Sequence, residues 1–106
     1  MSNLLISALK LLSMEKEDQM EYINGLFNDN DNESIEEILL EYDDAKYLID
    51  NYKSNDMLKE MFISLDIIIN EIDDNKLFYK NDLDNLLWDK ARIKARDIIK
   101  CMKYAK

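Results

Sequence analysis

The chain contains no proline, no histidine, one glycine and one cysteine among its 106 residues. Without histidine it cannot use imidazole acid–base catalysis, and it lacks a ligand of most zinc sites. A single glycine cannot build a glycine-rich phosphate loop, and the lone Cys101 cannot form an intrachain disulfide. These absences exclude many classes of enzyme and predict a protein of the reducing cytoplasm.

Long hydrophobic runs are also scarce. The apolar segment at residues 4–12 is interrupted by Lys10, has no positive charge before it, and is followed by charged residues instead of a small-residue cleavage site. A transmembrane helix needs about 20 predominantly apolar residues. We therefore expect no signal peptide and no contact with a membrane, and we interpret this segment as a core helix.

Negative charge is what the chain has in excess. Asp and Glu number 23 and Lys and Arg number 14, which gives a formal net charge of −9, while 47% of the residues are hydrophobic. That hydrophobic content is too high for a disordered acidic tail. The length is typical of one domain, so we expect a single helical domain over residues 1–106.

Short polar side chains mark the expected helix ends in place of proline and glycine, because they bond to nearby backbone groups. Ser13 is expected to cap a helix over about residues 14–24 that stops at the Asn24-Gly25 pair. A capping box of the type S-x-x-E at residues 34–37 begins a second helix.

Apolar residues then recur every three or four positions, which is the spacing of one helical face. The second helix has such a stripe over residues 35–52, although the aspartate pair at 43–44 could divide it into two shorter helices. A third helix starts at the polar cluster 54–56. It carries a stripe over residues 58–72, and we expect it to be the most deeply buried helix.

A last helix is expected to begin at the cap Asn81-Asp82. Its core face reads Trp88, Ala91, Ala95, Ile98, Met102 and Ala105. No segment alternates with period two for long enough to indicate a strand. The sequence therefore predicts an all-α fold, a compact bundle of four to six helices with no sheet.

We find no convincing catalytic or metal-binding pattern. The loop at residues 29–33 opens like a calcium loop, but Ser34 stands where glycine is needed and Leu40 where a bidentate glutamate is needed. Acidic residues are so numerous that a pair of carboxylates carries no signal. Asp66, between Leu65 and Ile67, has the least favourable surroundings for an acid, although the helical spacing leaves it a route to the surface. We expect no enzymatic activity, no metal and no cofactor.

The charge is distributed unevenly. Residues 1–53 hold four lysines and thirteen acids, a balance of −9, whereas residues 54–106 hold ten bases and ten acids. Eight acids and no base lie within residues 29–44, and residues 89–106 carry a local +5. The acidic block is either a solubilising surface or a surface whose mutual repulsion a positively charged partner relieves.

Two apolar side chains, one within the acidic block and one just after it, support the second interpretation. Leu40 and Tyr47 fall off the apolar stripe, and an exposed aromatic ringed by charges is typical of an interface, although a wider buried face would explain both. The basic last helix is better explained by its helix dipole than by nucleic-acid binding, because the whole domain is negative. The residues expected to bind a partner are Glu33, Glu36, Glu37, Glu41, Asp43, Asp44 and Tyr47.

The end of the chain carries a family resemblance. With LLWDKARIKARDII at residues 86–99, this small acidic helical chain resembles the immunity proteins that protect bacteria from toxins of contact-dependent growth inhibition and related polymorphic toxin systems. The resemblance implies a non-catalytic protein that binds one cognate toxin, often a basic RNase or DNase, and blocks its active site or substrate groove. The charge argument leads to the same class, because a nuclease groove that holds a polyanion can accept an acidic helix instead.

Two alternatives remain open. The first is an antitoxin, or an inhibitor of phage origin that mimics nucleic acid, and the neighbouring genes would separate it from toxin immunity. The second is a helical adaptor or structural subunit that associates with itself through the apolar stripe of residues 56–72. Sedimentation would identify it, because that protein would not be a monomer.

Overall fold

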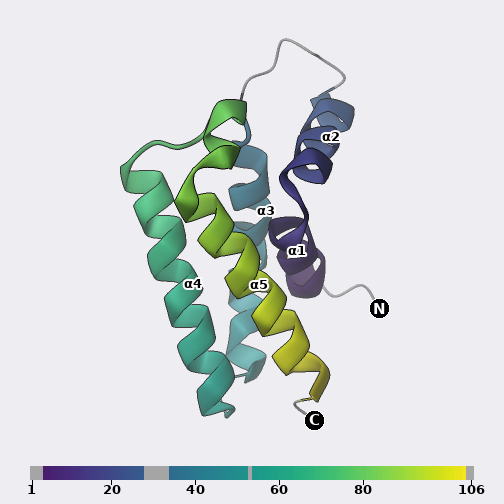
Figure 1. Ribbon diagram of the computed structural model, residues 1–106. Helices are drawn as coiled ribbons and strands as arrows, with labels where there is room; N and C mark the ends of the chain where they lie inside the picture. The colour runs from purple at the N-terminus through teal and green to yellow at the C-terminus, as the bar shows by residue number, and fades with distance from the viewer. Residues whose placement is uncertain (1–3, 28–33, 53, 105–106) are drawn as a thin grey trace.

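The computed structural model describes residues 4–27, 34–52 and 54–104, and in these ranges it contains five α-helices and no strand (Figure 1). The α-helices are α1 (Leu4–Ser13), α2 (Lys16–Phe27), α3 (Glu36–Ala45), α4 (Asp56–Asp74) and α5 (Leu86–Tyr104). Two 3-10 helices, η1 (Lys46–Tyr52) and η2 (Lys80–Asp84), connect them. The predicted all-α bundle is confirmed.

Four of the helices surround one core. α5 packs against both α4 and α1, and α1 packs in turn against α3. In Figure 1, α5 therefore lies in front of the core and α3 behind it. The largest fully buried side chains are Trp88, Tyr42 and Phe62. The indole Nε1 of Trp88 donates a hydrogen bond to the carbonyl of Leu77 at 3.0 Å, so this buried polar atom has a partner.

The predicted apolar stripes face this core. Leu58, Phe62, Leu65 and Ile72 of α4 are buried, as are Trp88, Ala91, Ala95 and Ile98 of α5. The most deeply buried helix is nevertheless α1, not α4, because half of its ten residues are buried. α1 packs against both α3 and α5, whereas α4 leaves one side in water, where Ile63 and Ile67 are each more than half exposed.

The start of α4 follows the sequence signal. Asn55 is its N-cap, and the side-chain Oδ1 of Asn55 accepts a hydrogen bond from the backbone N–H of Leu58 at 3.0 Å. The end of α2 does not follow it, because the helix continues past Gly25 to Phe27. Gly25 has no positive φ, so it does not form the left-handed stop that the Asn24-Gly25 pair predicted.

The expected capping box at residues 34–37 is also wrong. The N-cap of α3 is Ile35, and the Oγ of Ser34 accepts from the N–H of Glu36 at 3.3 Å instead of from that of Glu37. Ser34 pairs with Tyr79 in an isolated β-bridge, and the N–H of Ile35 donates to the carbonyl of Phe78 at 2.7 Å. α3 nevertheless begins at Glu36, within the predicted residues 34–37, directly after this pairing with a distant segment.

The last helix begins later than predicted. Asn81 and Asp82 lie within η2, where the carboxylate of Asp82 accepts from the N–H of Tyr79 at 3.1 Å. α5 begins at Leu86, and the Oδ1 of Asn85 accepts from the N–H of Leu87 at 2.9 Å. The long second helix is divided as well, because α3 ends at Ala45 and η1 follows it, just beyond the aspartate pair that allowed a division.

Candidate protein-binding site

The predicted partner-binding residues lie mostly along one exposed side of α3. The buried residues of this helix, which face the core, are Ile38, Leu39, Tyr42 and Ala45. With 3.6 residues per turn, the remaining positions form the outward half of the helix. We call this half the acidic face of α3; its acids are Glu36, Glu37, Glu41, Asp43 and Asp44.

The two apolar side chains that fall off the predicted stripe are exposed beside these acids. Leu40 lies within the acidic face and is 44% exposed, and Tyr47, in η1, is 65% exposed. The alternative explanation, a wider buried face, is thus wrong for both residues. The remaining predicted residue, Glu33, lies outside the described residues.

Like charges crowd each other on the acidic face. Burial raises the pKa of Glu37 above its usual value, and the neighbouring Glu41 and Asp44 raise it further. The hydroxyl of Tyr22, on α2, donates to Glu41 at 3.4 Å. The folded chain therefore opposes the ionisation of Glu37, as expected where carboxylates share a surface without cations.

Four cations of the described residues pair with acids outside α3. Arg96 of α5 pairs with Glu15 at 2.7 Å, and Lys16 pairs with Asp84. Among the described residues, no ion pair includes a carboxylate of α3. The basic helix α5 lies across the core from α3 (Figure 1), so it does not neutralise the acidic face by direct contact.

A cavity of about 250 Å³ borders the acidic face between α3 and α4. We call it the α3–α4 groove; it is lined by Glu36, Leu39, Leu40, Tyr42, Asp43, Lys46, Ile69, Asn70, Asp73 and Phe78. The hydroxyl of Tyr42 donates to Asp66 at 3.3 Å, and the Nζ of Lys46 lies 3.6 Å from the same carboxylate oxygen. These contacts join α3 and η1 to α4. Asp66, whose neighbours in the sequence are apolar, thus has two polar partners.

Burial and the Asp66 carboxylate together raise the pKa of the Tyr42 hydroxyl far above its ordinary value. The phenol therefore keeps its proton and remains a hydrogen-bond donor at any physiological pH. Sequence analysis missed the groove, because its α4 side comes from residues 69–73 and Phe78 joins it from the following loop. Only tertiary packing places these residues beside α3.

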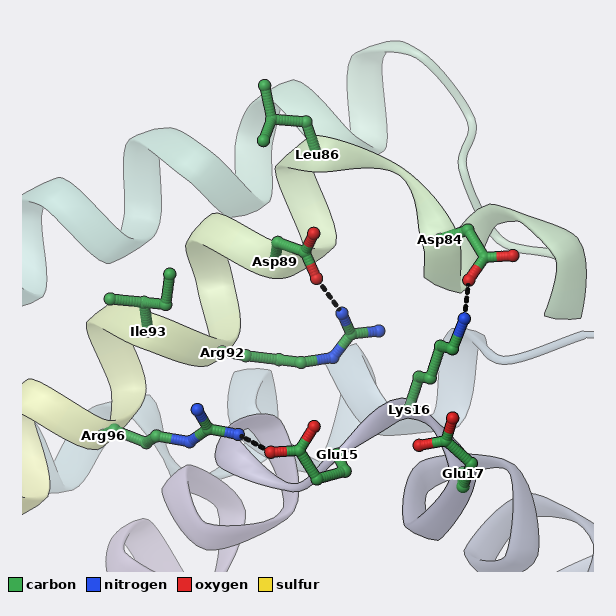
Figure 2. Close-up of a pocket in the computed structure, with 9 residues that line it drawn as sticks. All are labelled: Glu15, Lys16, Glu17, Asp84, Leu86, Asp89, Arg92, Ile93 and Arg96. Carbon is green, nitrogen blue, oxygen red and sulfur yellow. Dashed lines mark hydrogen bonds and ion pairs between the residues drawn. The ribbon is translucent and has the colours of Figure 1, made fainter.

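A second, larger cavity of about 560 Å³ lies where the start of α2 meets η2 and α5. Figure 2 shows that its charged side chains point toward one another, and the dashed lines join Glu15 to Arg96, Lys16 to Asp84 and Asp89 to Arg92. Pairing with Lys16 lowers the pKa of the Asp84 carboxyl. All three cations of this cavity, and every acid of it except Glu17, are thus in ion pairs, which favours a structural role.

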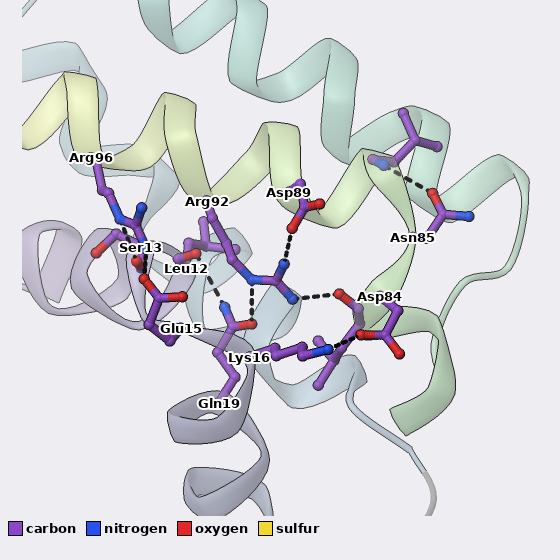
Figure 3. Close-up of polar contacts among 12 residues, drawn as sticks. Leu12, Ser13, Glu15, Lys16, Gln19, Asp84, Asn85, Asp89, Arg92 and Arg96 are labelled. Atoms are coloured by element: carbon purple, nitrogen blue, oxygen red, sulfur yellow. Dashed lines mark hydrogen bonds and ion pairs between the residues drawn. The ribbon is translucent and has the colours of Figure 1, made fainter.

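The polar contacts below this cavity hold α5 to the turn between α1 and α2 (Figure 3). The side-chain Nε2 of fully buried Gln19 donates to the carbonyls of Leu11 and Leu12 at 3.0 and 3.1 Å, and its Oε1 accepts from the Nε of Arg92 at 3.0 Å. Arg92 also donates to the Leu83 carbonyl at 2.6 Å and to Asp89 at 2.5 Å. Arg92 is therefore a buried structural residue and adds little to the surface charge of α5.

Within residues 4–27, 34–52 and 54–104, no three Asp, Glu, Cys or His side chains are grouped so that they could hold a metal ion. In the same ranges, none of the helices combines the length and the apolar character that crossing a membrane requires.

Comparisons with protein-family models, with curated proteins and with solved structures found no match to this chain. The resemblance of residues 86–99 to immunity proteins therefore stays a prediction. In the structure, Trp88, Ala91 and Ala95 of that segment are buried against the other helices, so packing alone accounts for this part of the pattern.

Proposed function

We propose that this chain is an immunity protein that binds a cognate bacterial toxin, a basic nuclease, and blocks its active site or substrate groove. One observation carries the proposal. Five carboxylates and an exposed leucine occupy one side of α3, and no cation of the described residues pairs with them. A partner that supplies lysines and arginines would relieve their repulsion.

A nuclease has a surface of this chemistry, because it must hold a polyanion. Its Lys and Arg side chains are arranged to receive phosphates, and a helix that carries a carboxylate on successive turns can take the place of those phosphates. Long-range attraction would bring the two proteins together at a rate constant of up to about 10⁸ M⁻¹s⁻¹ at low salt. Added salt would slow this association, because it screens exposed charges.

The apolar members of the site would supply affinity that charge alone does not. Interface energy concentrates in a few aromatic or apolar anchors that are surrounded by polar contacts. Tyr47 and Leu40 are exposed next to the acids and have this composition around them. They are therefore the expected anchors of the complex, while the carboxylates steer the partner and set its orientation.

The competing proposal of self-association receives no support from the apolar stripe on which it depended. Leu58, Phe62, Leu65 and Ile72 are buried inside the chain itself, so they are not available to a second copy. The large apolar residues that α4 does expose are Met57, Ile63 and Ile67, and both Lys59 and Glu60 lie between the first two of them in the sequence.

The test is capture followed by inhibition. The tagged chain is used as bait in its native cells, and the retained protein is purified and assayed for cleavage of RNA and DNA while the chain is titrated in. We expect a basic nuclease whose activity falls to zero at one chain per nuclease. Retention of a second copy of the chain, or of a nuclease that stays active in the complex, would refute the proposal.

A further inference from the structure

We propose that the α3–α4 groove receives the side chain of one arginine presented by the partner protein. This inference rests on the proposed function, because it names the chemical group that the partner places beside the acidic face. Small-molecule pockets usually enclose about 300–1,000 Å³. The groove, at about 250 Å³, is smaller than that range and suits one long side chain.

The apolar part of the lining fits the stem of an arginine. Leu39, Ile69 and Phe78 line the groove, and they offer apolar surface to the methylene groups that long basic side chains bury while the charged end stays near water. A guanidinium is weakly hydrated and stacks on aromatic faces, whereas an ammonium is a compact, strongly hydrated charge. The presence of Phe78 therefore favours arginine over lysine.

The charged part of the lining fits the guanidinium. Glu36 and Asp43 come from α3 and Asp73 comes from α4, so carboxylates border the groove on both helices. None of these three carboxylates makes a hydrogen bond or an ion pair with the described residues. The planar fork of arginine can donate to several acceptors at once.

The one positive charge in the lining does not neutralise these carboxylates. Lys46 is the one cation among the residues that line the groove, and its Nζ lies 3.6 Å from the Asp66 carboxylate. Three carboxylates and one engaged ammonium leave the lining negative. The larger cavity of Figure 2 differs, because three of its four carboxylates already pair with its arginines and its lysine.

The experiment uses the full chain and a defined probe, so it needs no partner. Amide chemical shifts are followed by NMR while Nα-acetyl-arginine methylamide is added. We expect saturable shifts at Leu40, Asn70 and Asp73. The citrulline derivative, which has the same shape without the charge, and the lysine derivative should each bind at least about tenfold more weakly.

Two tryptophan variants give a matched comparison. Asn70 lines the groove and is exposed, so Asn70→Trp should weaken binding of the arginine probe at least about tenfold by occupying the groove. Asn81→Trp makes the same change at an exposed position of η2 outside the lining and should leave binding unchanged. Asp73→Asn, which needs no extra space, should weaken binding about threefold or more and covers the case in which Asn70→Trp does not fold.

Shifts that never saturate, that spread over surface carboxylates in general, or that the lysine and citrulline probes reproduce would overturn the inference. So would unchanged binding to a folded Asn70→Trp variant. The arginine probe replaces the partner, so its failure to bind would refute the groove as an arginine site without testing the proposed function. The nuclease titration would still test the proposed function. If the titration failed while the groove bound arginine, the site would stand and the assigned partner would be wrong.

Discussion

Replacing Gln19 by methionine tests the polar network that holds α5 to the turn between α1 and α2. Gln19 is fully buried, and its amide makes three hydrogen bonds, to the carbonyls of Leu11 and Leu12 and from Arg92. Methionine has a similar length and can make none of these bonds. The carbonyl of Leu11 would keep a long bond from the N–H of Met14 at 3.4 Å, but the Leu12 carbonyl and one guanidinium N–H would lose these partners.

A buried polar group without a partner costs about 1–3 kcal/mol, and more when it is charged. Two such groups give an expected loss of about 3–5 kcal/mol in the free energy of unfolding, against a total of about 5–15 kcal/mol for a typical domain. The variant should therefore be far less stable and remain folded only at low temperature or with little denaturant.

Urea unfolding measures this loss, with the fluorescence of buried Trp88 and far-UV circular dichroism as two probes. Glu15→Gln is the matched control, because it removes an exposed partner of Arg96 from the same turn. It should cost about 0.5 kcal/mol or less. A loss below about 1 kcal/mol for Gln19→Met, or equal losses for both variants, would refute the assignment of Gln19 and Arg92 as a structural pair.

Three further predictions concern single side chains of α3 and η1. Because the pKa of Glu37 is raised in the folded chain, its ionised form destabilises the fold. Glu37→Gln should therefore be more stable than the natural chain at pH 7, and this difference should vanish as the pH falls to about 4. Urea unfolding at several pH values measures it. A difference in urea midpoints that does not change with pH would contradict this prediction. Tyr42 should not ionise in the folded chain, so Tyr42→Phe should leave the tyrosinate absorbance titration of the folded protein unchanged; a curve with one tyrosine fewer would show that Tyr42 does titrate. Tyr47→Ala should change the free energy of unfolding by about 0.5 kcal/mol or less, since Tyr47 is 65% exposed. It should nevertheless weaken binding of the captured nuclease at least about tenfold, whereas Ile93→Ala on α5 should leave binding unchanged. Equal affinities of the two variants would show that Tyr47 is not an anchor.

The apolar periodicity was sufficient to predict the helices and most of the core, because each stripe must face the core wherever the helix lies. It also placed Leu40 and Tyr47 outside the core, and both are exposed. The sequence also predicted a helix end correctly where the signal acts within a few residues, as at Asn55, whose side chain caps the helix that follows it. Information contained within a few consecutive residues was thus readable from the sequence.

The remaining features depend on contacts between distant segments. Ile35 pairs with Phe78 just before α3, and no local pattern reveals this contact. Arg92 belongs by composition to a basic helix, yet it is 5% exposed because Gln19 and the Leu83 carbonyl meet it in space. The α3–α4 groove could not be predicted for the same reason, since its two sides meet only in the fold.

The central claim is that the acidic face of α3 is the surface that binds a basic nuclease. Its most direct test is the affinity of the captured nuclease for Glu37→Lys/Asp44→Lys, compared with Glu17→Lys/Asp97→Lys. Each acid-to-lysine reversal adds two charges, so both double variants change the net charge from −9 to −5, but only the first alters α3. The α3 variant should lose about 100-fold or more in affinity and the control about tenfold or less, with the largest gap at low salt. Equal affinities for the two variants would contradict the claim.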